Sequence, residues 1–342
     1  MILLDSLYIN SGGGLRLLEY LVRMLQQKNI EFFLLADSRC TGKFGSVKHV
    51  EYMQASIMQR HQFYKKHRND YSTVLCFGNI PPTVNLTVPV YTYFHNINLL
   101  KLEGCISGIR RCLAFLKRVY IHSLSRNTDK WIVQTTNTQE ELHRHFKIEK
   151  DEILILPFFE LEDDDSNAQV CHDKKDYVLI GNYNFGNRGH NELIEAWKIL
   201  NDKGIHRTLH LTVDWQDAGF KAIEMKYNFE ELGIVNHGFV DFKSVVDLYG
   251  RSKAIVYPSR NESLGLGLIE AVYYGCDVIS ADLPYTYSVC TPSEVFDPYS
   301  AQSIAAAIER YEAGNSSKSR LKIYNQINDL VSLIAPSLGI HQ

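Results

Sequence analysis

The sequence predicts an α/β protein with two Rossmann-like domains, each built on a doubly wound parallel sheet. Short apolar runs typical of buried strands alternate with helical patterns, as in sheets that helices cover on both faces. The alternation occurs twice, on either side of the polar and charged stretch 160–176. A chain of 342 residues also exceeds what one ordinary core supports, so two domains are expected.

In the first domain, predicted over residues 1–157, six short runs are continuously apolar, as expected of strands buried on both faces. They are residues 2–4, 31–35, 74–77, 90–94, 131–134 and 153–156. A helical pattern follows the first strand, with these apolar residues on one face: Leu15, Leu18, Leu21, Val22 and Leu25. Pro157 ends the last strand, and residues 158–176 form the predicted linker.

The second domain, predicted over residues 177–318, repeats this alternation. Its predicted strands are residues 177–181, 209–213, 235–239, 254–257 and 278–281, and its predicted helices are 191–200, 266–274 and 303–311. The final segment, 319–342, carries a helical pattern over 321–334. One architecture is therefore expected twice, without a repeat of fixed period.

Composition is typical of a cytoplasmic globular protein. Hydrophobic residues make up 45% of the chain and charged residues 22%, as in soluble domains. A net charge of −3 gives no reason to expect a nucleic-acid partner. No apolar run reaches membrane-spanning length, and the first residues, MILLDSLYI, lack the basic start of a secretion signal. The seven cysteines are scattered, which predicts a reducing compartment and no disulfide or metal framework.

The most informative stretch is 257–285, which has the order strand, turn, helix, strand. Pro258 ends the first strand, Gly265 and Gly267 flank the helix start, and Gly275 is a natural helix stop. The N–H groups that are free at a helix start attract anions, and the helix dipole adds to this attraction. The turn is therefore predicted to bind an anion.

Two carboxylates border this turn, Glu262 before it and Glu270 within the helix. Both would repel a ligand that is only a phosphate. Ionised carboxylates are pure acceptors, however, so they bind hydroxyl groups well. A nucleotide sugar carries a diphosphate together with hydroxyls on its ribose and its sugar, and it is the ligand that this combination predicts.

The pattern P-S-x-x-E-S-x-G-L-x-x-x-E-A at 258–271, followed by G-x-D-V-I at 275–279, resembles the signature of the retaining glycosyltransferases of family 4. The resemblance implies the GT-B fold, in which two Rossmann-like domains face an interdomain cleft. It also implies transfer of a sugar from a nucleotide sugar to an acceptor hydroxyl, with retention at the anomeric carbon. Glu262 would then hold hydroxyls of the donor sugar, and Glu270 those of the ribose.

The resemblance further implies where the diphosphate binds. It would rest on a cationic side chain and on the residues of the turn, which are Ser263, Leu264, Gly265 and Leu266. The cation is Arg188, which stands at the Lys position of a segment, 182–189, that is similar to G-R-x5-K-G. The Arg position holds Asn182 instead, and Arg260 is the nearest residue that could replace the missing charge.

A second turn, Gly238-Phe239-Val240, resembles the base-binding turn of the family. Backbone groups would contact the base there, so these side chains indicate little about which base is bound. Phe239 could instead be an ordinary core residue at the end of its predicted strand.

Gly13 and Gly14 come after the first strand and open a helix, where glycine lets the backbone approach a phosphate or sugar closely. In the family this loop lies over the donor diphosphate and near the acceptor. The alternatives are a plain structural turn and a dinucleotide-binding loop with Asp37 as its acidic residue. The dinucleotide pattern G-x-G-x-x-G is incomplete, because Leu17 stands where its last glycine is needed.

His95 follows the strand 90–94, at the end of the strand where ligands bind in parallel sheets. The resemblance implies that His95 contacts the donor sugar, so His95 and Glu262 are the catalytic candidates. The leaving phosphate would accept the proton of the acceptor hydroxyl, and no side-chain base is expected. A lone histidine of structural role is the alternative for His95.

The segment 101–130 is locally basic and has apolar residues at helical spacing, among them Leu113, Leu116 and Val119. One interpretation is a helix that packs its apolar face on the sheet and exposes its basic face. The other adds attraction to an anionic membrane surface near a lipid-linked acceptor, which would make the protein peripheral on the inner face of the membrane. Family context indicates a surface polysaccharide or lipid-linked glycan as the acceptor.

No cofactor and no metal are expected, because the only aspartate cluster, residues 163–165, lies in the linker and far in sequence from the glycine turns. Three other functions remain as alternatives. A nucleotide-sugar epimerase can share the fold, an NAD-dependent oxidoreductase would use the first glycine loop, and a non-catalytic subunit would bind the donor without turning it over.

Overall fold

The computed structural model describes residues 1–100, 108–161, 174–183 and 187–336. For residues 108–111 it describes the backbone only. The chain divides into two compact units. Unit 1 comprises Met1–Glu160 and Tyr324–Gln342, and unit 2 comprises Leu161–Ile323. The acidic run 163–165, most of the predicted linker and the start of the basic segment lie outside the described residues.

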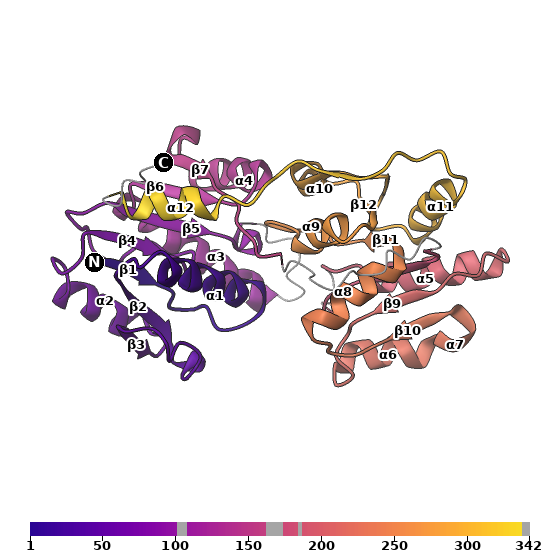
Figure 1. Ribbon diagram of the computed structural model, residues 1–342, viewed down its shortest axis with the longest axis horizontal. Coiled ribbons are helices and arrows are strands. Elements are labelled where there is room, and N and C mark those ends of the chain that lie inside the picture. Colours follow the sequence, from indigo (N-terminus) through magenta and orange to yellow (C-terminus); the bar gives the residue numbers. More distant parts are fainter. Residues whose placement is uncertain (101–107, 162–173, 184–186, 337–342) are drawn as a thin grey trace. The chain divides into compact units, whose positions relative to one another are not determined.

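Unit 1 is built on a seven-stranded parallel sheet with the order β3-β2-β1-β4-β5-β6-β7 (Figure 1). Its strands are β1 (Ile2–Asp5), β2 (Phe32–Asp37), β3 (Val50–Met53), β4 (Thr73–Cys76), β5 (Val90–Phe94), β6 (Lys130–Val133) and β7 (Ile153–Ile155). Its helices are α1 (Gly12–Gln27), α2 (Ile57–Lys66), α3 (Gly108–Ser123), α4 (Thr136–Phe146) and α12 (Ile327–Ile334). The predicted strands of this half are confirmed, with small shifts at their ends.

Strand β3 and helix α2 were not predicted, because each has few apolar residues in a regular pattern. β3 is an edge strand whose residues are exposed or half-buried, so it lacks the apolar run of the inner strands. α2 buries only Arg60, Phe63 and Tyr64, and its mean hydropathy is low. Neither element therefore carries the periodic apolar pattern that identifies a strand or a helix.

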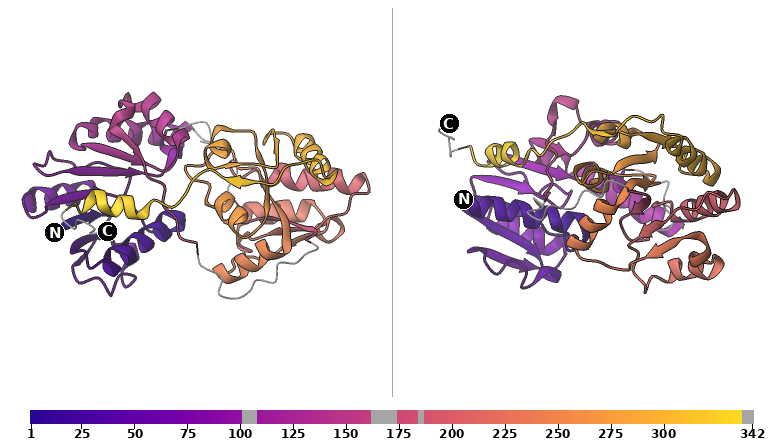
Figure 2. Two further views of the ribbon diagram at one scale, coloured as in Figure 1. Left: turned by 45° about the horizontal axis from the view of Figure 1, so that its top comes forward. Right: turned by 45° about the vertical axis from the view of Figure 1, so that its right-hand side comes forward.

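The C-terminal helix α12 belongs to unit 1, where it packs beside α1 (Figures 1 and 2). Leu330 and Ile334 of α12 share one core with Leu18 and Leu21 of α1. The helix predicted over 321–334 begins only at Ile327, because Leu321 belongs to the short strand β15 (Arg320–Leu321), which pairs antiparallel with β13 (Cys290–Thr291). The helical spacing therefore overestimated the length of α12.

Unit 2 is built on a six-stranded parallel sheet with the order β10-β9-β8-β11-β12-β14. Its strands are β8 (Asp176–Leu179), β9 (Leu209–Leu211), β10 (Ile234–Asn236), β11 (Ser252–Tyr257), β12 (Asp277–Ala281) and β14 (Glu294–Phe296). Its helices are α5 (His190–Asp202), α6 (Ala218–Lys226), α7 (Phe229–Leu232), α8 (Phe242–Arg251), α9 (Leu266–Tyr273), α10 (Pro284–Val289) and α11 (Ala301–Glu312).

Both sheets are doubly wound, as predicted, and the strand order of each reverses at one point. The reversal lies between β1 and β4 in unit 1 and between β8 and β11 in unit 2. In open parallel sheets, ligands bind outside the carboxyl ends of the strands at such a point. The loops after β1 and β4, and those after β8 and β11, are therefore the expected places for a site.

Candidate active site

The turn between β11 and α9 has the geometry that its glycines predict. Gly265 adopts a left-handed backbone (φ 69°) and begins α9 as its N-cap, with no side-chain cap. The first N–H groups of a helix lack acceptors within the helix, so the α9 start has donors for an anion. Of the neighbouring side chains, Ser263 and Leu266 are half-buried and Leu264 is buried.

Glu262 is held rigidly at the start of this turn. Its Oε1 accepts hydrogen bonds from the Tyr257 hydroxyl (2.9 Å) and the Ser259 hydroxyl (2.7 Å). The same oxygen lies 3.4 Å from Nη1 of Arg188, and the Glu262 side chain is 16% exposed. Among the described residues, these contacts all fall on Oε1, which leaves Oε2 as an acceptor for a hydroxyl group.

Arg188 comes from the loop between β8 and α5, and the structure brings it to Glu262 as well as to Tyr257. Its Nη1 donates to the Tyr257 hydroxyl at 3.3 Å. The hydroxyl of Tyr257 and the carboxylate of Glu262 together raise the pKa of Arg188 above its usual value. The guanidinium is therefore a permanent cation beside the turn.

Gly189 lets this loop lie against the turn. A Cβ at Gly189 would lie 2.5 Å from the carbonyl oxygen of Pro258, and the backbone is left-handed there (φ 66°). The N–H of Arg260 also donates to the carbonyl of Asn187 (2.8 Å). Two loops that follow neighbouring strands, β8 and β11, are thus joined beside the reversal point of the sheet.

Asn182, which stands at the Arg position of the family segment, is exposed and carries no charge. Arg260, the residue expected to replace the missing charge, has contacts of its own. Arg260 forms an ion pair with Glu192 (2.7 Å), and its guanidinium lies 4.4 Å from the ring centroid of Tyr299. Arg260 is therefore engaged in a structural contact of its own.

Glu270, the second carboxylate of the motif, is buried at 3% exposure in α9. The Tyr249 hydroxyl donates to its Oε2 at 3.4 Å. Burial, followed by the charge of Glu270, raises the pKa of Tyr249 well above its usual value. Tyr249 therefore stays protonated and remains a donor to the carboxylate.

The turn after β10 corrects the interpretation of Phe239. The predicted strand 235–239 ends at Asn236, because Gly238 adopts a left-handed backbone (φ 71°) that turns the chain. Phe239 is 82% exposed, so the alternative that placed it in the core is wrong. Val240, the third residue of the turn, is half-buried.

In unit 1 the structure brings His95 and Gly14 together. A Cβ at Gly14 would lie 3.5 Å from Nε2 of His95, so the imidazole lies over the first turn of α1. Gly13 has open space around it, and α1 begins without a side-chain cap. The ring of His95 meets those of Phe77 and Tyr93 edge-on, at centroid distances of 5.1 and 5.9 Å.

The protonation of His95 follows from its surroundings. Burial lowers the pKa of His95 to about 4, so the imidazole is neutral at neutral pH. Its Nδ1 is enclosed and has no hydrogen-bond partner within the described part of the chain. A neutral imidazole has one donor and one acceptor nitrogen, which suits contact with a hydroxyl.

The loop that carries His95 is held in place by Asn79 and Arg60, and no sequence motif predicts this role for either residue. Asn79 (φ 67°) accepts hydrogen bonds through Oδ1 from the backbone N–H groups of His95 (2.7 Å) and Asn96 (3.0 Å). The next residues are anchored by the buried Arg60, which donates to the carbonyls of Ile80 and Pro81, both at 2.8 Å. These contacts join three separate segments, so no spacing in the sequence reveals them.

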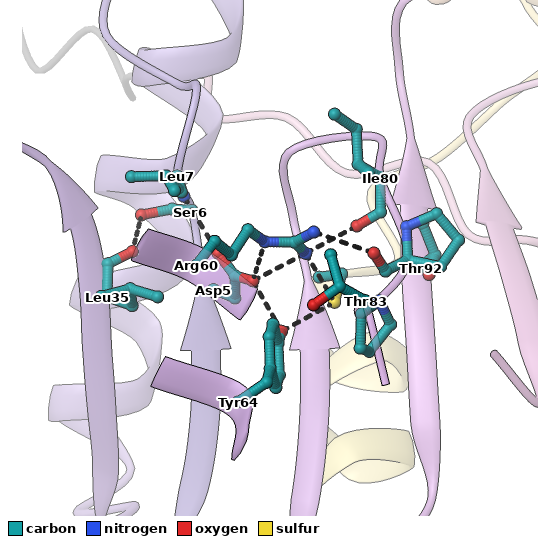
Figure 3. A network of polar contacts seen from close by, with 12 residues as sticks. Asp5, Ser6, Leu7, Leu35, Arg60, Tyr64, Ile80, Thr83 and Thr92 are labelled. Carbon is teal, nitrogen blue, oxygen red and sulfur yellow. Dashed lines mark hydrogen bonds and ion pairs between the residues drawn. The ribbon is translucent and has the colours of Figure 1, made fainter. Parts of the chain in front are cut away.

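Arg60 is fixed in turn by Asp5 at the end of β1 (Figure 3). The two charges lie 2.8 Å apart and are almost fully buried, with side-chain exposures of 2% and 1%. The Tyr64 hydroxyl donates to the same carboxylate at 2.6 Å. Breaking this buried pair would leave an uncompensated charge inside unit 1.

The basic segment forms helix α3, but part of its predicted core face is exposed. Leu113, Leu116 and Val119 are 53%, 55% and 47% exposed, so the expectation that they pack on the sheet is wrong. Ile121 instead is buried and packs in a core cluster with Trp131. The helix therefore turns a different face to the sheet from the one that the spacing predicts.

Two features are absent from the residues that the structure describes. These residues contain no group of three or more His, Cys, Asp or Glu side chains that could hold a metal ion. None of their helices is both long enough and apolar enough to cross a membrane.

Comparison with known proteins agrees with this architecture. Residues 162–328 match the family model of the glycosyl transferases group 1. No curated protein matches the sequence. Among solved structures, the sucrose-phosphate synthase of Thermosynechococcus elongatus is similar with a TM-score of 0.64 and 17% identity, over 91% of this chain and 89% of that one.

Two further structures are similar over almost the whole chain. One is the apo form of the lipopolysaccharide outer core galactosyltransferase WaaB, with a TM-score of 0.65, 12% identity and coverage of 99% and 95%. The other is HepE of Anabaena in complex with UDP-glucose, with a TM-score of 0.65, 14% identity and coverage of 97% and 94%. The chain thus has the GT-B fold, and its residues 162–328 are similar to the glycosyl transferases group 1.

Proposed function

We propose that this protein is a retaining glycosyltransferase of family 4 that moves a hexose from a nucleotide sugar to an acceptor hydroxyl. The observation that carries the proposal is the position of Glu262 and Arg188, side by side at the start of α9. A fixed carboxylate, a permanent cation and free helix N–H groups match sugar hydroxyls and a diphosphate together. HepE, a structural neighbour, is bound to UDP-glucose, which supports a nucleotide sugar as the donor.

In this proposal each part of the donor has its own contacts. Glu262 holds hydroxyls of the sugar through Oε2, and Glu270 holds the ribose. Arg188 and the backbone N–H groups of Leu264–Leu266 bear the diphosphate. Stabilising the charge on the departing diphosphate is then the main contribution to catalysis.

His95 and the first turn of α1 contribute from unit 1 in the same scheme. The low pKa of His95 keeps it neutral, so it contacts the donor sugar as a hydrogen-bond partner and does not act as an acid. Gly13, which has open space around it, leaves the backbone of α1 accessible to the donor, and Gly14 lets His95 lie close to that backbone. The departing phosphate accepts the proton of the acceptor hydroxyl, and the reaction needs no bound metal or cofactor.

The direct test is a thermal-shift screen with UDP-, GDP-, ADP- and TDP-sugars, because a ligand that binds the folded state raises the melting temperature. The donor that gives the largest shift is then incubated with and without acceptors, and the product anomer is determined by NMR. Donor isomerised without an acceptor would indicate an epimerase, and donor that binds without turnover would indicate a non-catalytic subunit. Nicotinamide binding seen by fluorescence, without any shift from nucleotide sugars, would favour an NAD-dependent oxidoreductase.

We also propose that α3 binds an anionic membrane surface, where a lipid-linked glycan or growing surface polysaccharide would present the acceptor. The observation in favour is the exposure of Leu113, Phe115, Leu116 and Val119 on a helix that also carries Lys117. Apolar and basic side chains on one exposed helix are typical of helices that lie in a lipid interface. The protein would then be a cytoplasmic, peripheral membrane enzyme.

Vesicle co-sedimentation tests this second proposal. Binding to vesicles that contain anionic lipid should be lost on charge reversal at Arg110, Arg111, Lys117 and Arg118. The matched control reverses Lys65 and Lys66 at the end of α2, which should leave binding unchanged. Equal binding by both variants would argue against a membrane role of α3.

A further inference from the structure

Two large aromatic side chains are exposed at the carboxyl edge of the unit 2 sheet. Trp215 is 50% exposed in the loop after β9, and Phe239 is 82% exposed in the turn after β10. β9 and β10 are parallel neighbours, so both loops leave the sheet at the same edge. This is the edge where ligands bind in parallel sheets.

The two loops are joined by the side chain of Asn236, the last residue of β10. Its Oδ1 accepts from the N–H of Val213 (2.9 Å) and of Gly238 (3.2 Å), and its Nδ2 donates to the carbonyl of Val213 (3.0 Å). The loop of Trp215 is also tightened by Asp214, which accepts from the N–H of Gln216 at 2.8 Å. These hydrogen bonds fix the loop that carries Trp215.

Gly238 lies directly against the indole of Trp215. A Cβ at this position would come within 2.0 Å of the indole Nε1 and 2.5 Å of the adjoining ring carbon. Glycine is required here both by the left-handed backbone (φ 71°) and by the closeness of the indole. The base-binding turn implied by the family resemblance therefore has the Trp215 ring as its immediate neighbour.

We propose that the indole of Trp215 stacks on the nucleobase of the donor, while the backbone of the Gly238–Val240 turn contacts the edge of the base. This inference rests on the proposed function, because it needs a nucleotide ligand. Stacking on an aromatic ring tolerates any base, so Trp215 supplies affinity and the turn supplies the choice of base. Trp215 is thus the stacking residue, and Phe239 is the aromatic residue that competes with it for this role.

Fluorescence quenching by iodide provides the first test, because Trp215 is the accessible one of the chain's three tryptophans. Trp131 and Trp197 are 2% and 1% exposed, so they serve as internal controls. The nucleoside diphosphate that raises the melting temperature should protect the iodide-accessible emission, whereas inorganic pyrophosphate should not. The accessible emission should disappear in Trp215→Phe.

Substitution provides the second test. Trp215→Ala should raise the Kd of the nucleoside diphosphate by roughly 10- to 100-fold, as expected for loss of one base-stacking contact. Its affinity for pyrophosphate should not change, and Trp215→Phe should restore much of the nucleotide affinity. Phe239→Ala tests the competing aromatic residue and should weaken nucleotide binding much less than Trp215→Ala does.

The outcomes separate this inference from the proposed function. If a nucleotide raises the melting temperature but leaves Trp215 open to iodide, the inference is wrong and the proposed function stands. The same holds if Phe239→Ala weakens nucleotide binding and Trp215→Ala does not. If no nucleotide or nucleotide sugar binds at all, the proposed function fails, and this inference fails with it.

Discussion

Nη1 of Arg188 lies 3.4 Å from Oε1 of Glu262. The two residues come from loops after different strands, β8 and β11, which are neighbours in the sheet. Arg188 and two hydroxyl groups all contact this one carboxylate oxygen, and no contact of Oε2 is seen among the described residues. The pair therefore offers one positive and one negative group to a single ligand.

Glu262→Gln should lower turnover of the nucleotide sugar by roughly 100-fold or more, the size of effect seen when one fixed polar group at a reacting centre is removed. The amide keeps the volume of the side chain but loses its charge beside Arg188. Steady-state kinetics with the donor found in the thermal-shift screen would measure the loss. Circular dichroism should show an unchanged fold, and wild-type turnover in this variant would contradict the assigned role.

Gly189→Ala should destabilise unit 2 strongly. The new methyl group would meet the carbonyl oxygen of Pro258, and the left-handed backbone adds strain, so we expect about 3 kcal/mol or more in the free energy of unfolding. Gly204→Ala is the matched control, because Gly204 is also left-handed (φ 77°) but has open space around it. It should cost about 1 kcal/mol.

Urea unfolding followed by Trp197 fluorescence, in a background without the other tryptophans, measures both glycine variants in unit 2. Similar losses in the two variants would mean that the close approach of Gly189 to Pro258 contributes little. Gly189→Ala should also weaken binding of pyrophosphate, because it moves the loop that carries Arg188.

The low pKa of His95 should make the free energy of unfolding decrease as the pH falls. Its pKa is about 4 in the folded protein and 6.5 in the unfolded chain, so between these values the unfolded state binds more protons. Stability contributed by the neutral ring is complete above pH 6.5 and declines as the pH falls toward 4. The melting temperature measured across this range should decline less steeply in His95→Gln than in the wild type.

His190 acts in the same direction, since burial lowers its pKa to about 3. The double variant His95→Gln/His190→Gln should therefore have a still flatter profile. An unchanged slope in both variants would show that other groups, such as the carboxylates, control the acid response.

Arg60→Met should destabilise unit 1 by about 3–5 kcal/mol, because it leaves the carboxylate of Asp5 buried without its charged partner. The double variant Asp5→Leu/Arg60→Met removes both charges and should be the more stable of the two. Urea unfolding followed by Trp131, which lies in unit 1, measures both. A double variant as unstable as the single one would mean that the anchored loop, rather than the unpaired charge, causes the loss.

The arrangement of strands and helices was largely predictable, because an inner strand of a parallel sheet must be apolar along its length. β5 and β12 are examples, buried almost throughout and recognisable from composition alone. The edge strand β3 was not predictable, because one side of it faces solvent and its sequence shows no apolar run. The exposed face of α3 was misassigned for a related reason: helical spacing identifies an apolar stripe but not what covers it.

The sequence by itself determined the two doubly wound sheets, the glycine turn before α9 and the two glutamates that border it, since each depends on neighbours along the chain. Only the tertiary structure decided that Arg188 reaches Glu262, that Gly238 lies on Trp215 and that Asn79 holds the backbone of His95. Each of these contacts joins loops from different strands. Their geometry depends on strand order and packing. Neither produces a periodic pattern in the sequence, so these contacts could not be predicted from it.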